Sequence, residues 1–312
     1  MKDFSYNTSE KLNNTLAKIN DVRIKILTTP ISPKDELRLR WEAHVDRINA
    51  SFALSGIAIS KQEIVKILSA GKNKKLNSQE HEVIFYKKGF DYLNQNWLVA
   101  KRNVSVRSLL ILHSIINRQS KLPGREEAIK NLLDFIQSSR EHSIVLSGIA
   151  YIQFLAICGS GINENKLARF LAYLYLYKNG YDFRGLLNIE ESFLKVRNSY
   201  QSIIDATIKS PNLTLWLEYY AAGILDILYQ VEKDVGEVRF HLDIPARHWQ
   251  LNDRQREVLT HLEKPDMSIT NRYVQHLFKV SQITASRDLA RLEALGIIFA
   301  HGKGRSVYYT QV

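Results

Sequence analysis

Residues 158–169 read Cys-Gly-Ser-Gly-Ile-Asn-Glu-Asn-Lys-Leu-Ala-Arg and bring a thiol, a carboxylate and two cations close together. The glycines precede a helical pattern, and the free N–H groups and positive dipole end of a helix N-terminus attract anions. Lys166 and Arg169 suit a phosphate ligand, whereas Glu164 would repel one. Cys158 would be a nucleophile only as a thiolate, and we expect an inert thiol buried at a helix end.

Two helices must hold this turn in place. Residues 144–157 are apolar at helical spacing, and an apolar stripe at steps of three and four continues after the turn. Its members are Leu167, Phe170, Leu171, Leu174 and Tyr175. Residues 143–162 carry no charge over a length that can span a bilayer. Serines, glycines and Gln153 interrupt them and no asymmetry of basic flanks supports insertion, so we predict a buried core helix.

The chain has 312 residues, 45% of them hydrophobic, a single cysteine and a formal net charge of +11. This length accommodates two domains with full cores. One cysteine excludes an internal disulfide and no signal-peptide pattern opens the sequence, so we expect a cytoplasmic protein. No histidines have metal-ligand spacing, and the glycines match neither the dinucleotide nor the P-loop pattern, so no cofactor or metal is expected.

The residues that frame the turn resemble the Fic family, which carries H-x-F-x-[DE]-G-N-G-R-x-x-R between two such helices. The matching framework includes Phe154, Ala168, Arg169 and the segments 177–184 and 190–193. In that family the histidine deprotonates a target hydroxyl, the acid binds magnesium, the Gly-Asn-Gly segment forms an anion nest and the arginines hold ATP phosphates. The resemblance covers roughly residues 30 to 235 and implies a mainly helical fold.

Most of the motif positions depart from the family pattern. In chain order, the residues at the motif positions are Cys158, Ser160, Ile162, Asn163, Glu164, Asn165, Lys166 and Arg169. Cys158 replaces the histidine and Ile162 the acid, residues 163–165 replace the nest, and only Arg169 matches. A thiol does not shuttle protons near neutral pH as imidazole does, and isoleucine cannot ligate magnesium. The resemblance therefore implies a Fic-like scaffold that has lost its catalysis.

A second segment resembles the family's inhibitory motif, [ST]-x-x-x-E-[GN], whose glutamate blocks the ATP site. Ser51 and Gly56 fit this pattern, and Ser55 stands where the glutamate would be. An inhibitor has no use without an activity to inhibit, so the two losses are coherent.

Charge is distributed unevenly along the chain. Residues 51–125 carry 13 basic and 4 acidic side chains, and so hold nine of the eleven net positive charges. Most of the basic ones are Lys72, Lys74, Lys75, Lys87, Lys88, Lys101, Arg102 and Arg107. They can add salt-dependent affinity for a phosphate backbone or form a solvated face, and the sequence leaves both open.

A separate pattern begins after a linker marked by Pro245 and Trp249. It predicts a helix from Asn252 to about residue 263, which Pro265 and Asp266 stop, and a short helix that opens at Thr270. A third helix follows over residues 282–295. The predicted core of these helices is Val258, Leu259, Leu262, Val274, Leu277, Ile283, Leu289, Leu292 and Leu295.

The third helix ends at Gly296, and two strands at residues 297–299 and 307–309 flank a basic turn. This order resembles a winged helix-turn-helix, whose third helix enters the major groove of DNA. Polar residues of that helix can reach base edges, and cations on the hairpin can contact phosphates. The DNA-binding residues that we expect are Gln282, Thr284, Ser286, Arg287, Arg291, Lys303 and Arg305.

The sequence thus predicts a mainly α protein in three parts: an N-terminal helical segment (1–50), a degenerate Fic-like domain (51–240) and a small α+β winged-helix domain (250–312). We expect an inactive scaffold that regulates transcription by binding double-stranded DNA, as a homodimer because paired modules read paired half-sites, and without a membrane span. Three alternatives stay open. The chain can be an atypical nucleotidyltransferase that transfers AMP to protein hydroxyls, the scaffold can bind a nucleotide or another anion near Lys166 and Arg169 without turnover, or the winged helix can contact protein.

Overall fold

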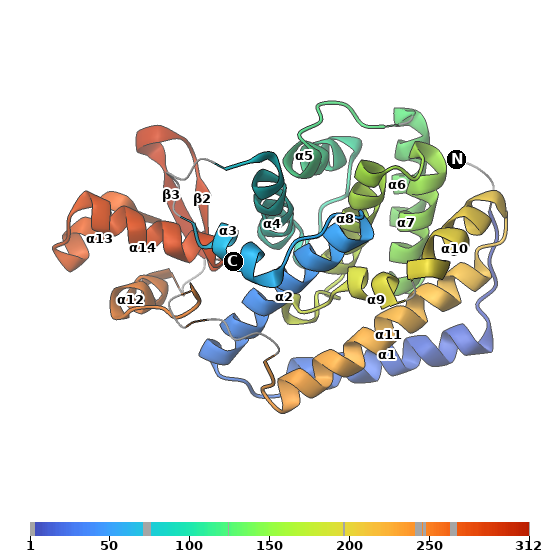
Figure 1. The fold of residues 1–312 in the computed structure, drawn as a ribbon, viewed down its shortest axis with the longest axis horizontal. Helices are drawn as coiled ribbons and strands as arrows, with labels where there is room; N and C mark the ends of the chain where they lie inside the picture. The colour runs from blue at the N-terminus through green and yellow to red at the C-terminus, as the bar shows by residue number, and fades with distance from the viewer. Residues whose placement is uncertain are drawn as a thin grey trace.

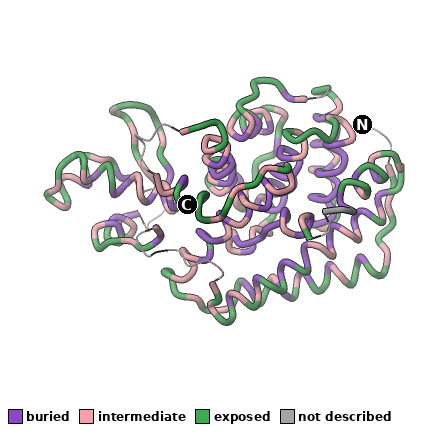
Figure 2. Tube along the Cα trace, viewed as in Figure 1, coloured by how far each residue is buried: buried purple, intermediate pink, exposed green. Residues whose placement is uncertain are grey.

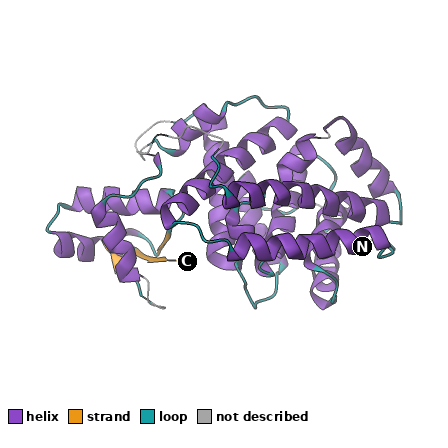
Figure 3. Ribbon diagram, turned by 90° about the horizontal axis from the view of Figure 1, so that it is seen from below, coloured by secondary structure: helices purple, strands orange, loops and turns teal. Residues whose placement is uncertain are grey.

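The computed structural model describes residues 4–70, 76–123, 125–195, 197–240, 245, 248–262 and 267–311. It is mainly helical (Figure 1), and a three-stranded antiparallel sheet lies at the C-terminal end of the chain (Figure 3). Both features confirm the predicted fold class. The helices of the main body (residues 4–240) are α1 (Glu10–Thr28), α2 (Pro33–Leu54), α3 (Lys61–Leu68), α4 (Ser78–Trp97), α5 (Val106–Asn117), α6 (Glu126–Ser138), α7 (Ser143–Cys158), α8 (Ile162–Lys178), α9 (Ile189–Lys195), α10 (Arg197–Lys209) and α11 (Thr214–Gly236).

Helices α7 and α8 pack against each other at the centre of the main body. Residues 144–155 of α7 and 166–177 of α8 are all buried, as the buried colour of these helices in Figure 2 shows. A helix that is surrounded by others must be apolar on every side, which explains the long uncharged segment. The predicted core helix is confirmed. Within the described ranges, no helix has the length and apolarity needed to cross a bilayer.

The other helices surround this pair. Helix α1 lies along α11 at one side of the main body (Figure 1), α2 packs on α9, and α4 packs on α5 and α8. The approach of α4 to α8 depends on Gly89, because a Cβ atom there would lie 2.6 Å from Phe170 and from Ile116. Helix α1 begins at Ser9, whose hydroxyl accepts a hydrogen bond from the backbone N–H of Leu12.

The C-terminal unit (residues 251–311) has a hydrophobic core of its own. Its elements are α12 (Asp253–Leu262), β1 (Ile269–Thr270), α13 (Asn271–Phe278), α14 (Gln282–Ala294), β2 (Ile298–His301) and β3 (Tyr308–Gln311). The sheet order is β1-β3-β2, with both pairs antiparallel. The three predicted helices and the hairpin are present, and the strands lie one or two residues later than predicted. Strand β1 was not predicted, because two residues leave no periodic signal.

Two predicted core positions in this unit are wrong. Ile283 is 65% exposed and Leu277 is 36% exposed. Helix α14 instead turns Ala285, Leu289 and Leu292 inward, so its buried face lies opposite Ile283. The predicted stop of α12 at Pro265 and Asp266 lies outside the described residues.

The end of α14 packs on α4 of the main body. Leu295 belongs to the core of the main body, and a Cβ atom at Gly296 would lie 3.4 Å from the Asp91 carboxylate. The predicted linker also packs on the main body, because Trp249 is buried and the guanidinium of Arg38 on α2 lies 5.4 Å from the centre of its ring. Helix α2 crosses position 50, and the division of the chain into three domains stays a prediction.

Candidate functional site

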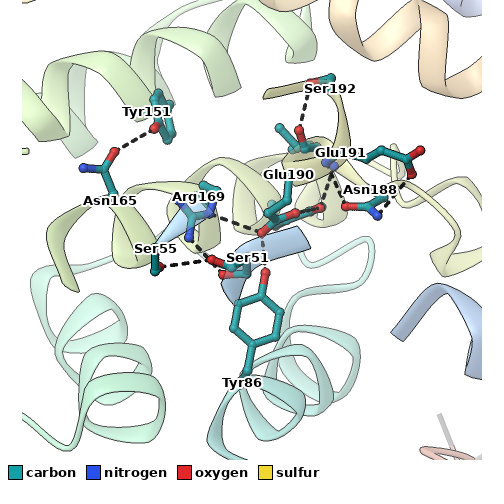
Figure 4. A network of polar contacts seen from close by, with 12 residues as sticks. Ser51, Ser55, Tyr86, Tyr151, Asn165, Arg169, Asn188, Glu190, Glu191 and Ser192 are labelled. Carbon is teal, nitrogen blue, oxygen red and sulfur yellow. Dashed lines mark hydrogen bonds and ion pairs between the residues drawn. The ribbon is translucent and has the colours of Figure 1, made fainter. Parts of the chain in front are cut away.

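The turn between α7 and α8 is held by a side chain of α8. Gly159 ends α7 with a φ of +91°, a conformation that favours glycine. The amide of Asn165 then donates hydrogen bonds to the carbonyl oxygens of Ser160 (2.6 Å) and Gly161 (3.0 Å). Its own oxygen accepts a hydrogen bond from the hydroxyl of Tyr151 at 3.0 Å (Figure 4). Asn165, which stands at the last position of the family's anion nest, therefore makes hydrogen bonds within the chain.

Glu164 places a carboxylate at the N-terminus of α8. A Cβ atom at Gly161 would lie only 2.3 Å from the Oε2 atom of Glu164. The positive end of the helix dipole thus already faces an anion of the chain itself. Ser160 and Asn163 are exposed at this end, and Ile162 is 57% exposed, so these three make no enclosed surface around the helix end.

Cys158 is half-buried, and its thiol donates a hydrogen bond to the carbonyl oxygen of Pro123 at 3.1 Å. Burial, and secondarily the charge of Glu164, raise the pKa of the Cys158 thiol to about 12. The sulfur therefore stays protonated near neutral pH and is neither a nucleophile nor a base.

Arg169 is enclosed in a buried polar cluster (Figure 4). Its Nε atom forms an ion pair with Glu190 at 3.3 Å, and its Nη2 atom donates a hydrogen bond to the hydroxyl of Ser51 at 2.9 Å. Arg169 is 2% exposed and Glu190 0%. Burial alone would lower the pKa of Arg169, but the Glu190 carboxylate and nearby tyrosine hydroxyls raise it above its ordinary value. Arg169 is thus charged, and an internal carboxylate already neutralises it.

Four tyrosines complete this cluster. Tyr86 of α4 donates a hydrogen bond to one oxygen of Glu190, and Tyr173 of α8 donates one to the other at 2.6 Å. The hydroxyls of Tyr151 and Tyr200 are hydrogen-bonded to each other. A buried charged pair needs such partners, because each unsatisfied polar atom in a core costs free energy.

The inhibitory-motif segment lies at the end of α2, beside this cluster. Ser51 is the hydrogen-bond acceptor of Arg169, and Ser55 donates a hydrogen bond to the Ser51 carbonyl oxygen at 3.0 Å. Gly56 follows with a φ of +76°. The carboxylate that faces Arg169 therefore comes from α9, through Glu190, and not from this segment.

Lys166 is also paired. It is 6% exposed, and its ammonium lies 3.5 Å from the carboxylate of Glu82 on α4. Burial lowers the pKa of Lys166, and Glu82 counteracts this effect only in part. The two cations expected to hold a nucleotide or another anion are both buried against acids of the main body.

Two clefts in the described structure lie elsewhere. One, of about 400 Å³, lies between α2 and residues 57–63. The other, of about 500 Å³, lies between α2, α9 and α11. Neither is lined by a residue of the segment 158–169. In the parts of the chain that are described, no three or more His, Cys, Asp or Glu side chains are grouped so that they could hold a metal ion.

The expected DNA-contacting residues separate into two groups. Gln282, Ser286 and Arg287 on α14 and Lys303 on the hairpin are exposed. Thr284 is half-buried, and its hydroxyl is hydrogen-bonded to that of Ser281 at 3.0 Å.

Two other positions are less suited to reach DNA or are not described. Arg291 is half-buried and burial lowers its pKa, so only part of its side chain is accessible. The side chain of Arg305 lies outside the described part of the structure.

The basic stretch 51–125 is not one continuous surface. Lys87 is buried and forms an ion pair with Asp91 at 2.8 Å, and the Arg102 guanidinium stacks over Trp97 at 4.5 Å. Of the eight basic residues named from the sequence, Lys88, Lys101, Arg102 and Arg107 are exposed. Lys72, Lys74 and Lys75 lie outside the described residues.

Sequence reasoning did not assign a role to Glu190, Tyr86 or Tyr173. Glu190 was part of the matching framework only, and its ion pair joins residues 21 positions apart in the chain. The segment 186–193 contains two adjacent glutamates, Glu190 and Glu191, among four apolar residues, so its sequence did not single out Glu190.

The comparisons with known proteins bear on the fold alone. No family model matches the sequence, and no curated protein matches it. Among solved structures, a Fic family protein from Desulfovibrio desulfuricans G20 covers 100% of this chain and 98% of its own, with a TM-score of 0.59 and 14% identity. Fic-1 from C. elegans covers 73% of this chain and 74% of its own, with a TM-score of 0.54 and 15% identity. These likenesses establish that the chain has the Fic fold.

Proposed function

We propose that this chain is a DNA-binding, transcriptional regulator built on a Fic fold that has lost nucleotidyl transfer, and that it acts in the cytoplasm. Its C-terminal unit is the DNA-binding part, a winged helix-turn-helix. The order helix, strand, two helices and hairpin supports this assignment, as does the sheet order β1-β3-β2. In such modules the helix in the position of α14 enters the major groove.

The observation that carries the proposal is the exposed polar face of α14. Gln282, Ser286 and Arg287 lie on neighbouring turns of its N-terminal half and are all exposed. Gln and Arg are the side chains that pair with adenine and guanine through two hydrogen bonds. Lys303 on the hairpin adds a cation of the kind that contacts phosphate.

This face is held in a fixed position. Asp288 on the buried side of α14 accepts hydrogen bonds from Asn252 (3.0 Å), Arg254 (2.9 Å) and Gln255 (3.1 Å) of the α12 region. On the other side, Asn271 of α13 donates to the hydroxyl of Ser286 at 2.8 Å. Because the helix is anchored on both neighbours, its exposed side chains need little reordering on binding.

The loss of catalysis is supported by the state of the phosphate-binding positions. Arg169 faces Glu190, Lys166 faces Glu82, and Glu164 lies at the N-terminus of α8. A triphosphate would have to displace each carboxylate, and Ile162 offers no oxygen for the metal ion that would offset its charge.

The test is a selection of duplexes from a random-sequence pool by the full chain, followed by titration of the selected duplex. We expect Arg287→Ala to weaken the selected duplex and to reduce its advantage over unrelated duplexes, by about 1–3 kcal/mol of discrimination. Lys303→Ala should weaken all duplexes alike and make the dependence of binding on salt less steep. Equal loss on every sequence from Arg287→Ala would contradict its assigned role.

We further propose that the chain binds DNA as a homodimer, since a pair of modules reads a pair of half-sites. Sedimentation of the chain with the selected duplex should give two chains per duplex, and the duplex should contain an inverted repeat. One chain on an asymmetric site would refute the dimer and leave DNA binding intact.

A further inference from the structure

Ile283 is a bulky apolar side chain that the C-terminal unit leaves in solvent. It is 65% exposed, although α14 belongs to a unit with a closed core. It is the second residue of α14, directly after Gln282 and one turn before Arg287.

The rotation of α14 fixes this exposure. At about 100° per residue, the buried residues Ala285, Leu289 and Leu292 lie about 180–240° from Ile283 around the helix axis. The hydrogen bonds of Asp288 with the α12 region hold that rotation. Ile283 therefore cannot turn into the core without breaking them.

Ile283 lies at the centre of the exposed face that would meet DNA. Ser286 lies about 60° from it on one side and Arg287 about 40° on the other, since residues three and four positions apart share a helix face. The bulky apolar side chain of Ile283 is thus flanked by a hydroxyl and a guanidinium.

We propose that Ile283 contacts the 5-methyl group of a thymine in the major groove, and so selects a T·A base pair at one position of the site. This inference rests on the proposed DNA-binding function. The methyl group of thymine is the apolar feature of the major-groove edge, and a branched alkyl side chain can contact it but cannot hydrogen-bond to the other bases. The exposed cations Arg272, Lys279, Arg287 and Lys303 of the same unit favour an anionic partner such as duplex DNA over an apolar protein surface.

The experiment removes one methyl group at a time. In the duplex selected by the full chain, each thymine is replaced singly by deoxyuridine, which lacks only that methyl group. Binding is measured for the wild-type chain and for Ile283→Ala. For the wild type we expect one position, or its symmetric mate, at which deoxyuridine weakens binding about fourfold, the effect of one buried methyl-sized group.

At that same position Ile283→Ala should bind the thymine and deoxyuridine duplexes equally. The matched control is Ile24→Ala on α1, since Ile24 is also an exposed isoleucine (59%) but lies far from the C-terminal unit in sequence. Ile24→Ala should lose as much affinity as the wild type when deoxyuridine replaces that thymine. Ile283→Val, which retains a branched apolar side chain, should show most of this loss of affinity.

Three results would overturn the inference. In the first, the wild type binds every deoxyuridine duplex as tightly as the thymine duplex. In the second, Ile283→Ala loses as much affinity as the wild type when the same thymine is replaced. Either result leaves DNA binding intact and refutes only the role of Ile283. If no duplex is retained even at low salt, and Ile283→Ala changes the sedimentation of the chain instead, the face contacts protein and the proposed function fails with the inference.

Discussion

Glu190→Gln tests whether the ion pair inside the main body is what holds Arg169. The substitution keeps the shape of the side chain but removes its charge, and so leaves a guanidinium that is 2% exposed without an acidic partner. One amide oxygen can still accept a hydrogen bond from Tyr86 or Tyr173, but not from both as the carboxylate does.

The expected loss is large for one side chain. Removing one partner of a buried ion pair costs about 3–5 kcal/mol, because the remaining charge stays buried without compensation. Taking about 4 kcal/mol, and about 2–4 °C per kcal/mol for a body of this size, the melting temperature should fall by about 8–16 °C.

Thermal unfolding of the full chain, followed by far-UV circular dichroism near neutral pH, measures this change. Glu191→Gln is the matched control, because Glu191 is the next residue of α9 and is only half-buried; it should change stability by less than about 0.5 kcal/mol. The double variant Arg169→Met with Glu190→Gln removes both charges and should recover at least half of the loss. An ion pair that does not stabilise Arg169 would be indicated if Glu190→Gln had the same melting temperature as Glu191→Gln, or if the double variant were as unstable as Glu190→Gln alone.

Three other predictions concern packing, pH and the thiol. Gly89→Ala should cost about 1–3 kcal/mol in chemical denaturation, because its Cβ atom would lie 2.6 Å from Phe170, whereas Gly236→Ala, with no atom within 4 Å, should cost nothing. Burial, then the charges of Arg47 and Lys87, hold the pKa of His44 well below 6.5. Below pH 6.5 the unfolded chain therefore binds a proton at this residue and the folded chain does not. The free energy of unfolding should fall as the pH drops below 6.5, by up to about 1.4 kcal/mol per pH unit from this group, and should fall less steeply in His44→Gln. With a pKa of about 12, ~10⁻⁴ of the Cys158 thiol is ionised near pH 8, so a disulfide reagent should modify it rapidly only after unfolding; fast reaction with the folded chain would contradict the assigned environment.

The sequence predicted the central helices well for a physical reason. An uncharged run such as residues 144–157 has no stable place except a core or a membrane, and the serines and glycines within it decided between the two. The helices of the C-terminal unit were also predictable, because Asn252, Thr270 and Ser281 are capping residues placed before apolar repeats.

The prediction of a buried Ile283 was wrong about the rotation of α14. It counted Ile283 with Leu289 and Leu292 because all three are apolar, although six and nine residues carry them about 240° and 180° around the helix axis from Ile283. The position that settles the rotation is Asp288, a buried carboxylate whose partners Asn252, Arg254 and Gln255 lie more than 30 residues earlier. A spacing rule that scores apolar residues cannot detect a buried acid of this kind.

The cluster around Arg169 shows the same limit. Its members Ser51, Tyr86 and Glu190 come from three helices that only the folded chain brings together. The motif comparison identified Arg169 as the position that fits a phosphate. It could not show that Glu190 already faces it, because the partner of a charge is set by packing and not by local sequence.

The proposed function requires that the chain binds duplex DNA and does not transfer nucleotide. The most direct measurement gives one preparation of the full chain two substrates: a random-sequence duplex pool at low salt, and labelled ATP with magnesium and a mixture of candidate protein targets. We expect selected duplexes to be retained and no protein to become labelled. Label transferred to a protein in a manner that depends on Lys166 and Arg169, with no duplex retained, would contradict the proposed function.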